Sequence, residues 1–237
     1  PLVLLGAVVD DVRLAADDGT DLLLLRLLVE GPGPEEVPVV GQGETVHPEL
    51  ADPRDRRYRY PFINCTQCGP RYTLITRLPY DRAHTAMAGF PLCPACRTEY
   101  ENPGDRRFHA EPLACPVCGP QLQFYSGEAG IIDDSAQALD ACVAALRAGF
   151  IVAVKGVGGY HLLCDARHDT AIARLRRLKP RPHKPLAVMF PFAGEDGLEQ
   201  VRSAAIVDRD SAELLLDAAR PIVLLEKRAP FPLSTLL

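Results

Sequence analysis

The chain has 237 residues, of which 47% are hydrophobic and 24% charged, a balance typical of a folded protein with one or two compact units. Its net charge of −5 argues against a general nucleic-acid binder but does not exclude a local basic patch. Apolar runs such as LLLL at 22–25 are far shorter than the ~20 residues of a membrane-spanning helix, and no secretory signal is evident. We therefore expect a cytoplasmic protein, and the initial Pro1 indicates a fragment.

Residues 1–42 contain two apolar runs, LVLLGAVV at 2–9 and LLLLRLLV at 22–29. The turn-like DDG at 17–19 separates them, and they fit either two strands or one helix. The segment carries no chemical motif. We leave it unassigned, as a leader or as the remnant of an upstream domain.

Residues 43–122 are rich in Pro, Arg, Tyr and Cys and show little helical or strand periodicity. Such a segment buries too little apolar surface to offset the entropy of ordering it, so a metal ion is the expected staple. Six of the eight cysteines fall in three C-x-x-C pairs: Cys65/Cys68, Cys93/Cys96 and Cys115/Cys118. This spacing, without a secretion signal, favours metal binding over disulfides.

The cysteines belong to an internal repeat. DRRYRYPFINCTQCGP at 55–70 recurs as DRRFHAEPLACPVCGP at 105–120. Upstream of the second copy stands CPAC at 93–96, and eighteen residues separate Cys96 from Cys115. This spacing predicts a zinc site of four thiolates, with every position filled by protein and therefore structural rather than catalytic. The alternative is a set of buried or redox-active thiols.

The first copy has only half of these ligands. Where the second copy has CPAC, the first has GETV at 43–46, and neither Gly43 nor Val46 binds zinc. Either Glu44 or His47 supplies a third ligand to Cys65 and Cys68, or that site is empty or poorly occupied. We interpret the segment as two duplicated zinc modules, of which the first has lost a ligand pair.

From about Ser135 the sequence alternates between helices and strands, which predicts an α/β domain with helices packed on a sheet. Ser135 is the expected N-cap of a helix that stops at Gly149. The further helices are expected at 169–178 and 210–219, and the strands at 150–156, 160–166, 185–190 and 221–226. The chain then ends before such a domain is normally complete.

Two features of this domain suit an anion. KGVGGYHLLCDA at 155–166 places flexible glycines after Lys155, although a simple strand-joining turn explains them as well. A more specific signal for anion binding is the segment RLRRLKPRPHKPLAVM at 174–189. It concentrates cations, the usual partners of phosphate oxygens. These cations are Arg174, Arg176, Arg177, Lys179, Arg181 and Lys184. A solvated basic face and contact with an RNA backbone are the alternatives.

Residues 55–120 closely resemble the paired zinc-finger region of the hydrogenase maturation carbamoyltransferases, the HypF family. KGVGGYHLLCDA and LRRLKPRPHKPLAVM resemble the start of the YrdC-like domain that follows these fingers in the family. The resemblance covers roughly residues 47–228. It implies a small irregular zinc-ribbon-type module at 43–122 and an α/β domain, of the YrdC-like α+β type, at 130–237, truncated at its C-terminus.

The resemblance also implies a function in making the cyanide ligands of nickel–iron hydrogenase. In that family an acylphosphatase-like domain releases carbamate from carbamoyl phosphate, and the YrdC-like domain joins carbamate to ATP as carbamoyl-adenylate. A C-terminal domain then passes the carbamoyl group to the terminal cysteine of the partner protein HypE. By position, Lys155, Lys179, Arg181 and Lys184 resemble the contacts to ATP, with Mg²⁺ a further candidate ion. No catalytic residue is assigned.

Three interpretations stay open at this point. The chain is a piece of an ATP-dependent carbamoyltransferase, a zinc-stabilised module that binds double-stranded RNA or tRNA, or a fragment without independent function. Residues 1–42 show no acylphosphatase signature, and the transfer domain is missing, so we expect an incomplete enzyme. The zinc pairs favour the first interpretation, because tRNA-modifying relatives of the YrdC type do not carry them.

Overall fold

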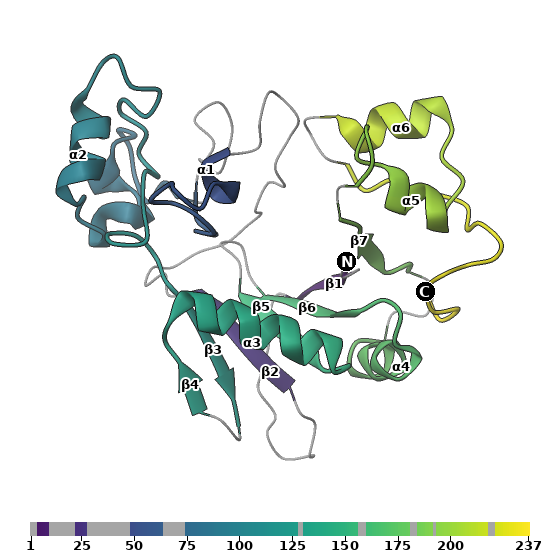
Figure 1. Cartoon of the computed structure of the whole chain (residues 1–237). Coiled ribbons are helices and arrows are strands. Elements are labelled where there is room, and N and C mark those ends of the chain that lie inside the picture. The colour runs from purple at the N-terminus through teal and green to yellow at the C-terminus, as the bar shows by residue number, and fades with distance from the viewer. Residues whose placement is uncertain are drawn as a thin grey trace.

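The computed structural model describes residues 4–9, 22–27, 48–63, 74–127, 130–155, 160–180, 184–191, 193–217 and 221–237. Within these residues an irregular finger segment, described at 48–63 and 74–120, lies between the second and third strands of a mixed sheet that carries the helices of the α/β domain (Figure 1). Cys65, Cys68, Arg181 and the proposed third ligands Glu44 and His47 lie outside the described residues. No helix in the described part of the chain combines the length and apolarity needed to cross a membrane.

The sheet is the framework of the molecule. Its strands lie in the order β4-β3-β2-β5-β6-β1-β7, and β2 runs parallel to β5 while the other neighbouring pairs are antiparallel. The strands are β1 (Leu4–Val9), β2 (Leu22–Leu27), β3 (Leu122–Ser126), β4 (Gly130–Ile132), β5 (Ile151–Lys155), β6 (Tyr160–Asp165) and β7 (Ala187–Met189). The two apolar runs near the N-terminus are therefore strands of this sheet rather than one helix.

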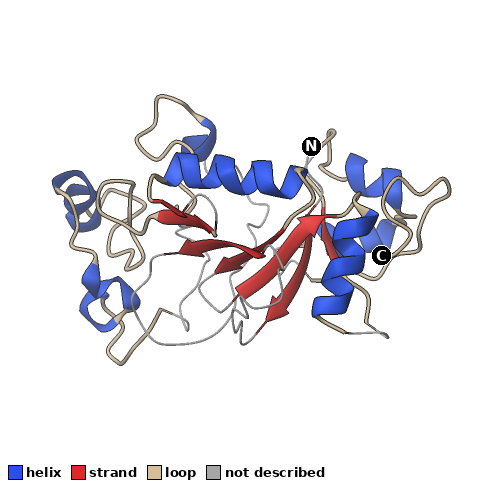
Figure 2. Ribbon diagram, turned by 90° about the horizontal axis from the view of Figure 1, so that it is seen from below, coloured by secondary structure: helices blue, strands red, loops and turns tan. Residues whose placement is uncertain are grey.

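Two helices cover opposite faces of the sheet. Successive side chains of a strand point to opposite sides, so neighbouring residues of β5 contact different helices. Ile151 and Ala153 of β5 pack in the cluster of α4 (Asp169–Leu178). Val152 packs instead in the cluster of α3 (Ser135–Arg147). Figure 2 shows the long helix α3 lying along one side of the strands. The predicted buried strand at 150–156 is confirmed, and its apolar residues on both faces explain why it reads as a continuous run.

The start of α3 corrects one expectation. Its N-cap is Asp134, whose carboxylate accepts a hydrogen bond from the Gln137 backbone amide, and not Ser135. The Ser135 hydroxyl accepts instead from the Leu122 backbone amide at 2.8 Å and donates to Gln121 Oε1. Ser135 thus ties the first turn of α3 to the start of β3.

The segment 221–226, expected to be the final strand, is not a strand in the structure. An isolated bridge follows this segment, between Lys227 and Ala205, the residue after α5 (Glu199–Ala204). Ile222 and Leu224 are 82% and 80% exposed. An apolar, β-prone sequence becomes a strand only when a neighbouring strand pairs with it, and none of the described residues does so here.

The remaining expected elements are confirmed with small shifts in their bounds. The helix expected at 169–178 is α4, the strand expected at 185–190 is β7, and the helix expected at 210–219 is α6 (Arg209–Leu216). The finger segment adds elements that periodicity does not indicate. These are α1 (Pro48–Ala51), the 3-10 turns η1 (Arg82–His84) and η2 (Ala86–Gly89), and α2 (Pro94–Glu101).

Candidate metal centre

The two copies of the repeat have the same backbone wherever both are described. Hydrogen bonds of one copy recur fifty residues later in the other. Thus the Arg59 amide donates to the Leu50 carbonyl and the His109 amide to the Tyr100 carbonyl, both at 3.0 Å. Arg59 and His109 also share a left-handed backbone, with φ of 55° and 49°, which side chains other than glycine rarely adopt. The sequence repeat is therefore a structural repeat.

Four cysteines of the second copy converge on one point. Cys93 and Cys96 lie at the start of α2, and Cys115 and Cys118 lie on the turn that ends the repeat, with all four Sγ atoms within 4.8 Å of one another. Cys93 Sγ is 3.8 Å from Cys115 Sγ, and Cys115 Sγ is 3.7 Å from Cys118 Sγ. A disulfide would require about 2.05 Å. A zinc tetrahedron with Zn–S of about 2.3 Å has edges of about 3.8 Å, so the quartet fits zinc.

The local backbone prepares these sulfurs to carry negative charge. The Cys96 amide donates a hydrogen bond to Cys93 Sγ, and the amides of Val117 and Cys118 donate to Cys115 Sγ. Burial nevertheless raises the pKa of Cys96 to about 12, with Cys118 and Cys115 adding to it and Arg56 opposing it. Adjoining thiolates repel one another, and a divalent cation is the group that stabilises all four together.

A glycine lets the cysteine turn close against the first copy. A Cβ on Gly119 would lie 2.2 Å from the Tyr60 hydroxyl and 2.5 Å from Ala114 Cβ, so the turn tolerates no side chain there. Tyr60, which is buried, donates from its hydroxyl to the Pro120 carbonyl at 3.1 Å. The first copy thus packs directly behind the second pair of ligands.

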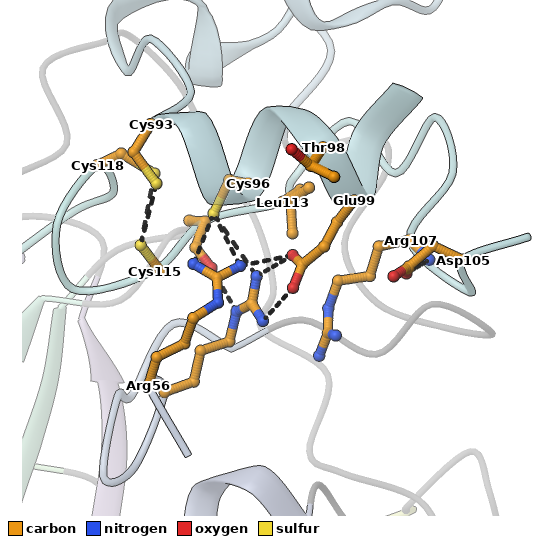
Figure 3. A network of polar contacts seen from close by, with 12 residues as sticks. Arg56, Cys93, Cys96, Thr98, Glu99, Asp105, Arg107, Leu113, Cys115 and Cys118 are labelled. Atoms are coloured by element: carbon orange, nitrogen blue, oxygen red, sulfur yellow. Dashed lines mark hydrogen bonds and ion pairs between the residues drawn. The ribbon is translucent and has the colours of Figure 1, made fainter. Parts of the chain in front are cut away.

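Two arginines of the first copy reach one cysteine of the second, Cys96, and Figure 3 shows Arg56 beside it. Both terminal nitrogens of Arg56 lie 3.3 Å from Cys96 Sγ, and its Nη2 also donates to Glu99 at 2.6 Å. Arg57, only 2% exposed, donates to the Glu99 carboxylate at 2.5 Å and from its Nε to the Ala114 carbonyl at 3.0 Å. Burial raises the pKa of Glu99, but the two guanidinium groups outweigh it and lower that pKa to about 2.

The second copy returns this contact. Arg106 and Arg107 both form ion pairs with Glu49 of α1, and the Arg107 Nη2–Glu49 Oε2 distance is 2.6 Å. Glu49 precedes Glu99 by fifty residues, so the two glutamates occupy equivalent positions of the repeat. Each copy's arginine pair therefore binds the other copy's glutamate. Sequence reasoning noticed the repeated Asp-Arg-Arg but gave it no role, since such a pairing joins residues about forty to sixty positions apart.

Two family models match the chain. The model described as "HypF finger" matches residues 47–75 and 92–125, and the model described as "Telomere recombination", which covers the Sua5, YciO and YrdC proteins, matches residues 144–236. The first match contains the cysteine quartet and the second contains β5, β6 and α4. Their order along the chain is the order that the resemblance predicts.

Curated relatives carry both regions. The chain is 53% identical over 180 residues to "Carbamoyltransferase HypF" of Synechocystis. The aligned region covers 76% of this chain and 23% of that protein. It is 44% identical over 209 residues to "Carbamoyltransferase HypF" of Rhodobacter capsulatus, covering 87% of this chain and 27% of that protein. The chain belongs to the HypF family. It spans about a quarter of the length of these relatives.

Solved HypF structures have the same fold. The crystal structure of T. kodakarensis HypF matches with a TM-score of 0.75 and 46% identity, over 84% of this chain and 26% of that one. Full-length HypF in its phosphate- and nucleotide-bound form matches with a TM-score of 0.69 and 50% identity, over 81% of this chain and 24% of that one. The expected class, an α/β YrdC-like domain after a small irregular zinc module, is confirmed.

The cations that resemble HypF nucleotide contacts lie outside this metal centre. Lys155 ends β5, and its ammonium lies 5.0 Å from the centre of the Tyr160 ring. Lys179 is the C-cap of α4. Lys184 is exposed and lies three residues before β7, beyond the residues of β7 that pair with β1. These cations belong to different elements of the α/β domain.

Part of the basic cluster has a structural use. Arg176 Nε donates to the Leu236 carbonyl at 2.8 Å, and Arg174 Nη2 donates to the Gly149 carbonyl at 3.4 Å. These two arginines hold backbone carbonyls of the α/β domain. The run of six cations is therefore not a single anion clamp, and the candidates for phosphate are those after α4.

Proposed function

We propose that this chain is the zinc-finger and adenylating part of a cytoplasmic carbamoyltransferase of nickel–iron hydrogenase maturation. The observation that carries the proposal is the joint presence of the cysteine quartet and of an α/β domain in which Lys155 ends β5 and Lys184 precedes β7. Support comes from the likeness to a HypF crystallised with phosphate and nucleotide. The free thiols of the described cysteines suit a reducing compartment.

In the proposed reaction a carbamate oxygen attacks the α-phosphorus of ATP. The bond from that phosphorus to the oxygen bridging to the β-phosphate breaks, and pyrophosphate leaves with the electron pair, giving carbamoyl-adenylate. Lys155, Lys179, Arg181 and Lys184 stabilise the charge that develops on the phosphates, with Mg²⁺ as the companion ion of ATP. Zinc takes no part in this chemistry, because all four of its positions are filled by cysteine.

The product has a defined further use in this proposal. Carbamoyl-adenylate is a mixed anhydride, and a thiolate attacks its carbonyl carbon and releases AMP. We place the accepting thiolate on the C-terminal cysteine of a HypE-like partner. Such a partner keeps the reactive intermediate away from water when it docks near the adenylating residues.

The experiment is ATP–pyrophosphate exchange by the full chain, with carbamoyl phosphate in one arm and carbamate in another. Exchange that requires either compound, and that falls at least tenfold in Lys179→Ala and Arg181→Ala variants, supports adenylation. The matched control is Arg209→Ala, which removes an exposed cation paired with Glu213 and is expected to keep full exchange. An Arg209→Ala loss equal to the others would contradict the proposal.

RNA binding is the competing outcome, favoured by the density of cations at 174–184. Absence of exchange in both arms, together with RNA affinity that falls steeply with salt, would replace the adenylation proposal with the binding one. If RNA affinity stays unchanged in the Lys179→Ala variant, the cations at 174–184 are not the RNA-binding site.

A further inference from the structure

We propose that the first copy of the finger acts as an outer-sphere clamp on the metal of the second copy, with Arg56 donating hydrogen bonds to the Cys96 thiolate. The inference rests on the metal site and is independent of the carbamoyl chemistry. It assigns a use to a copy that has kept only one of its two cysteine pairs, and it makes Arg56 a positioning residue for a site forty residues away.

The geometry singles out one sulfur. Cys96 Sγ, with no exposed surface, receives both terminal nitrogens of Arg56 at 3.3 Å and Arg57 Nη2 at 3.6 Å. These are charge-assisted contacts from a planar fork that cannot lose its proton. Cys93 and Cys115 instead accept hydrogen bonds from backbone amides, and Cys118 Sγ lies 3.7 Å from Cys115 Sγ with the charge of Arg82 nearby. Cys96 is therefore the thiolate that the first copy stabilises.

The clamp also balances charge. Four thiolates around a divalent ion leave a net charge of −2 in a partly buried site. Arg56 and Arg57 offset it, and Glu99, one turn from Cys96 on the same face of α2, fixes both guanidinium groups. A thiolate whose charge is stabilised in this way is a weaker nucleophile and a more lasting ligand.

The repeat supplies its own control. Arg106 occupies the position of Arg56 in the second copy and binds Glu49 as Arg56 binds Glu99. The counterpart of Cys96 in the first copy is Val46, which has no sulfur. Replacing Arg106 therefore removes an equivalent arginine–glutamate pair without removing a hydrogen bond to a thiolate. An effect of Arg56 that exceeds that of Arg106 isolates the contribution of the N–H···S contacts.

The first measurement is the zinc dissociation constant of the full chain, obtained by chelator competition with zinc alone. We expect Arg56→Ala to weaken zinc binding by about 10–100-fold, the usual effect of losing an outer-sphere partner. Arg106→Ala should leave the constant unchanged. Arg56→Lys, which keeps one charged donor, should fall between wild type and Arg56→Ala. Equal weakening by Arg56→Ala and Arg106→Ala would overturn the proposal.

The second measurement follows alkylation of the zinc-loaded chain by iodoacetamide, with each cysteine resolved by mass spectrometry. In the Arg56→Ala variant Cys96 should react faster relative to the other three ligands, because its thiolate has lost the two donors of Arg56. A purely structural loss would raise all four rates together, and that result would contradict the clamp. If Arg56→Ala does not fold, Arg56→Gln, which retains an N–H donor, takes its place with the same expected order.

Discussion

Buried side chains of the finger segment differ in kind from those of the α/β domain. In the finger they include Arg57, Arg107 and Glu111 beside the ligands Cys96 and Cys115. Around β5 and α4 the buried residues are almost all apolar, such as Ile151, Ile172 and Leu175. The difference teaches that the finger depends on paired charges and metal for its order, whereas the sheet domain depends on removal of apolar surface from water.

The largest expected effect breaks the apolar side of this comparison. Leu175, fully buried between α4 and the sheet, is replaced by Ala. The free energy of unfolding of the α/β domain should fall by about 2–5 kcal/mol, because the lost methyl groups leave a cavity. Zinc content should be unchanged. Denaturant unfolding followed by amide exchange in β5 and α2 measures the stability of the α/β domain and of the finger, and metal analysis measures the zinc content. Loss of zinc in this variant would contradict the claim that the two regions are stabilised separately.

Arg57→Ala tests the charged side. We expect the finger to lose about 3 kcal/mol, the lower end of the cost of breaking a buried ion pair, because Arg56 still faces Glu99. Arg97→Ala is the control, since its ion pair with Glu101 is exposed and should contribute at most about 1 kcal/mol. Amide exchange of α2 reports the difference. Equal effects of the two substitutions would mean that burial of Arg57 does not increase the contribution of its ion pair to the stability of the finger.

A smaller effect is expected at the start of α3. Asp134→Ala removes the carboxylate that caps this helix and should cost the α/β domain about 1 kcal/mol. Asp140→Ala on the same helix, whose carboxylate is exposed and bound to Arg59, serves as the control and should cost less. The denaturation midpoint of the α/β domain measures both, and a larger loss from Asp140→Ala would be inconsistent with this account.

The pH dependence of the α/β domain provides the most subtle test. Burial raises the pKa of Asp165, but hydrogen bonds from Arg167 outweigh it and hold that pKa below its usual value. The carboxylate therefore stabilises the fold fully above the ordinary aspartate pKa of about 3.9, and this stability is lost as pH falls toward the lowered value. Asp165→Asn should flatten this acid slope in β6 amide exchange. An unchanged slope would assign the acid sensitivity to other groups.

Local features of the sequence were sufficient for part of this structure. The helix at 169–178 has the predicted bounds because its apolar residues Ala171, Ile172 and Leu175 recur on one face. Cysteine spacing was sufficient for the quartet, because two C-x-x-C turns leave four thiols few other ways to meet. By contrast, 221–226 has strand composition but no partner among the described residues, and pairing is not a local property.

The reciprocal arginine–glutamate pairs could not be predicted for a related reason. Arg56 and Glu99 lie 43 positions apart, and only the folded repeat brings them together beside Cys96. The short helix α2 was missed because CPACRTEY has few apolar residues and owes its order to the cysteines at its start. Where tertiary contacts or a metal determine a structure, periodicity contains no signal for it.

The central claim is that the cysteine quartet of the second copy holds a metal that orders the finger beside an independently stable sheet. Zinc content and amide exchange of the full chain, measured with and without a strong chelator, test it most directly. We predict about one zinc per chain at this quartet, abolished by Cys115→Ser, with chelation exposing α2 while β5 stays protected. A chain that carries no metal, and whose α2 remains equally protected in chelator, would contradict the account.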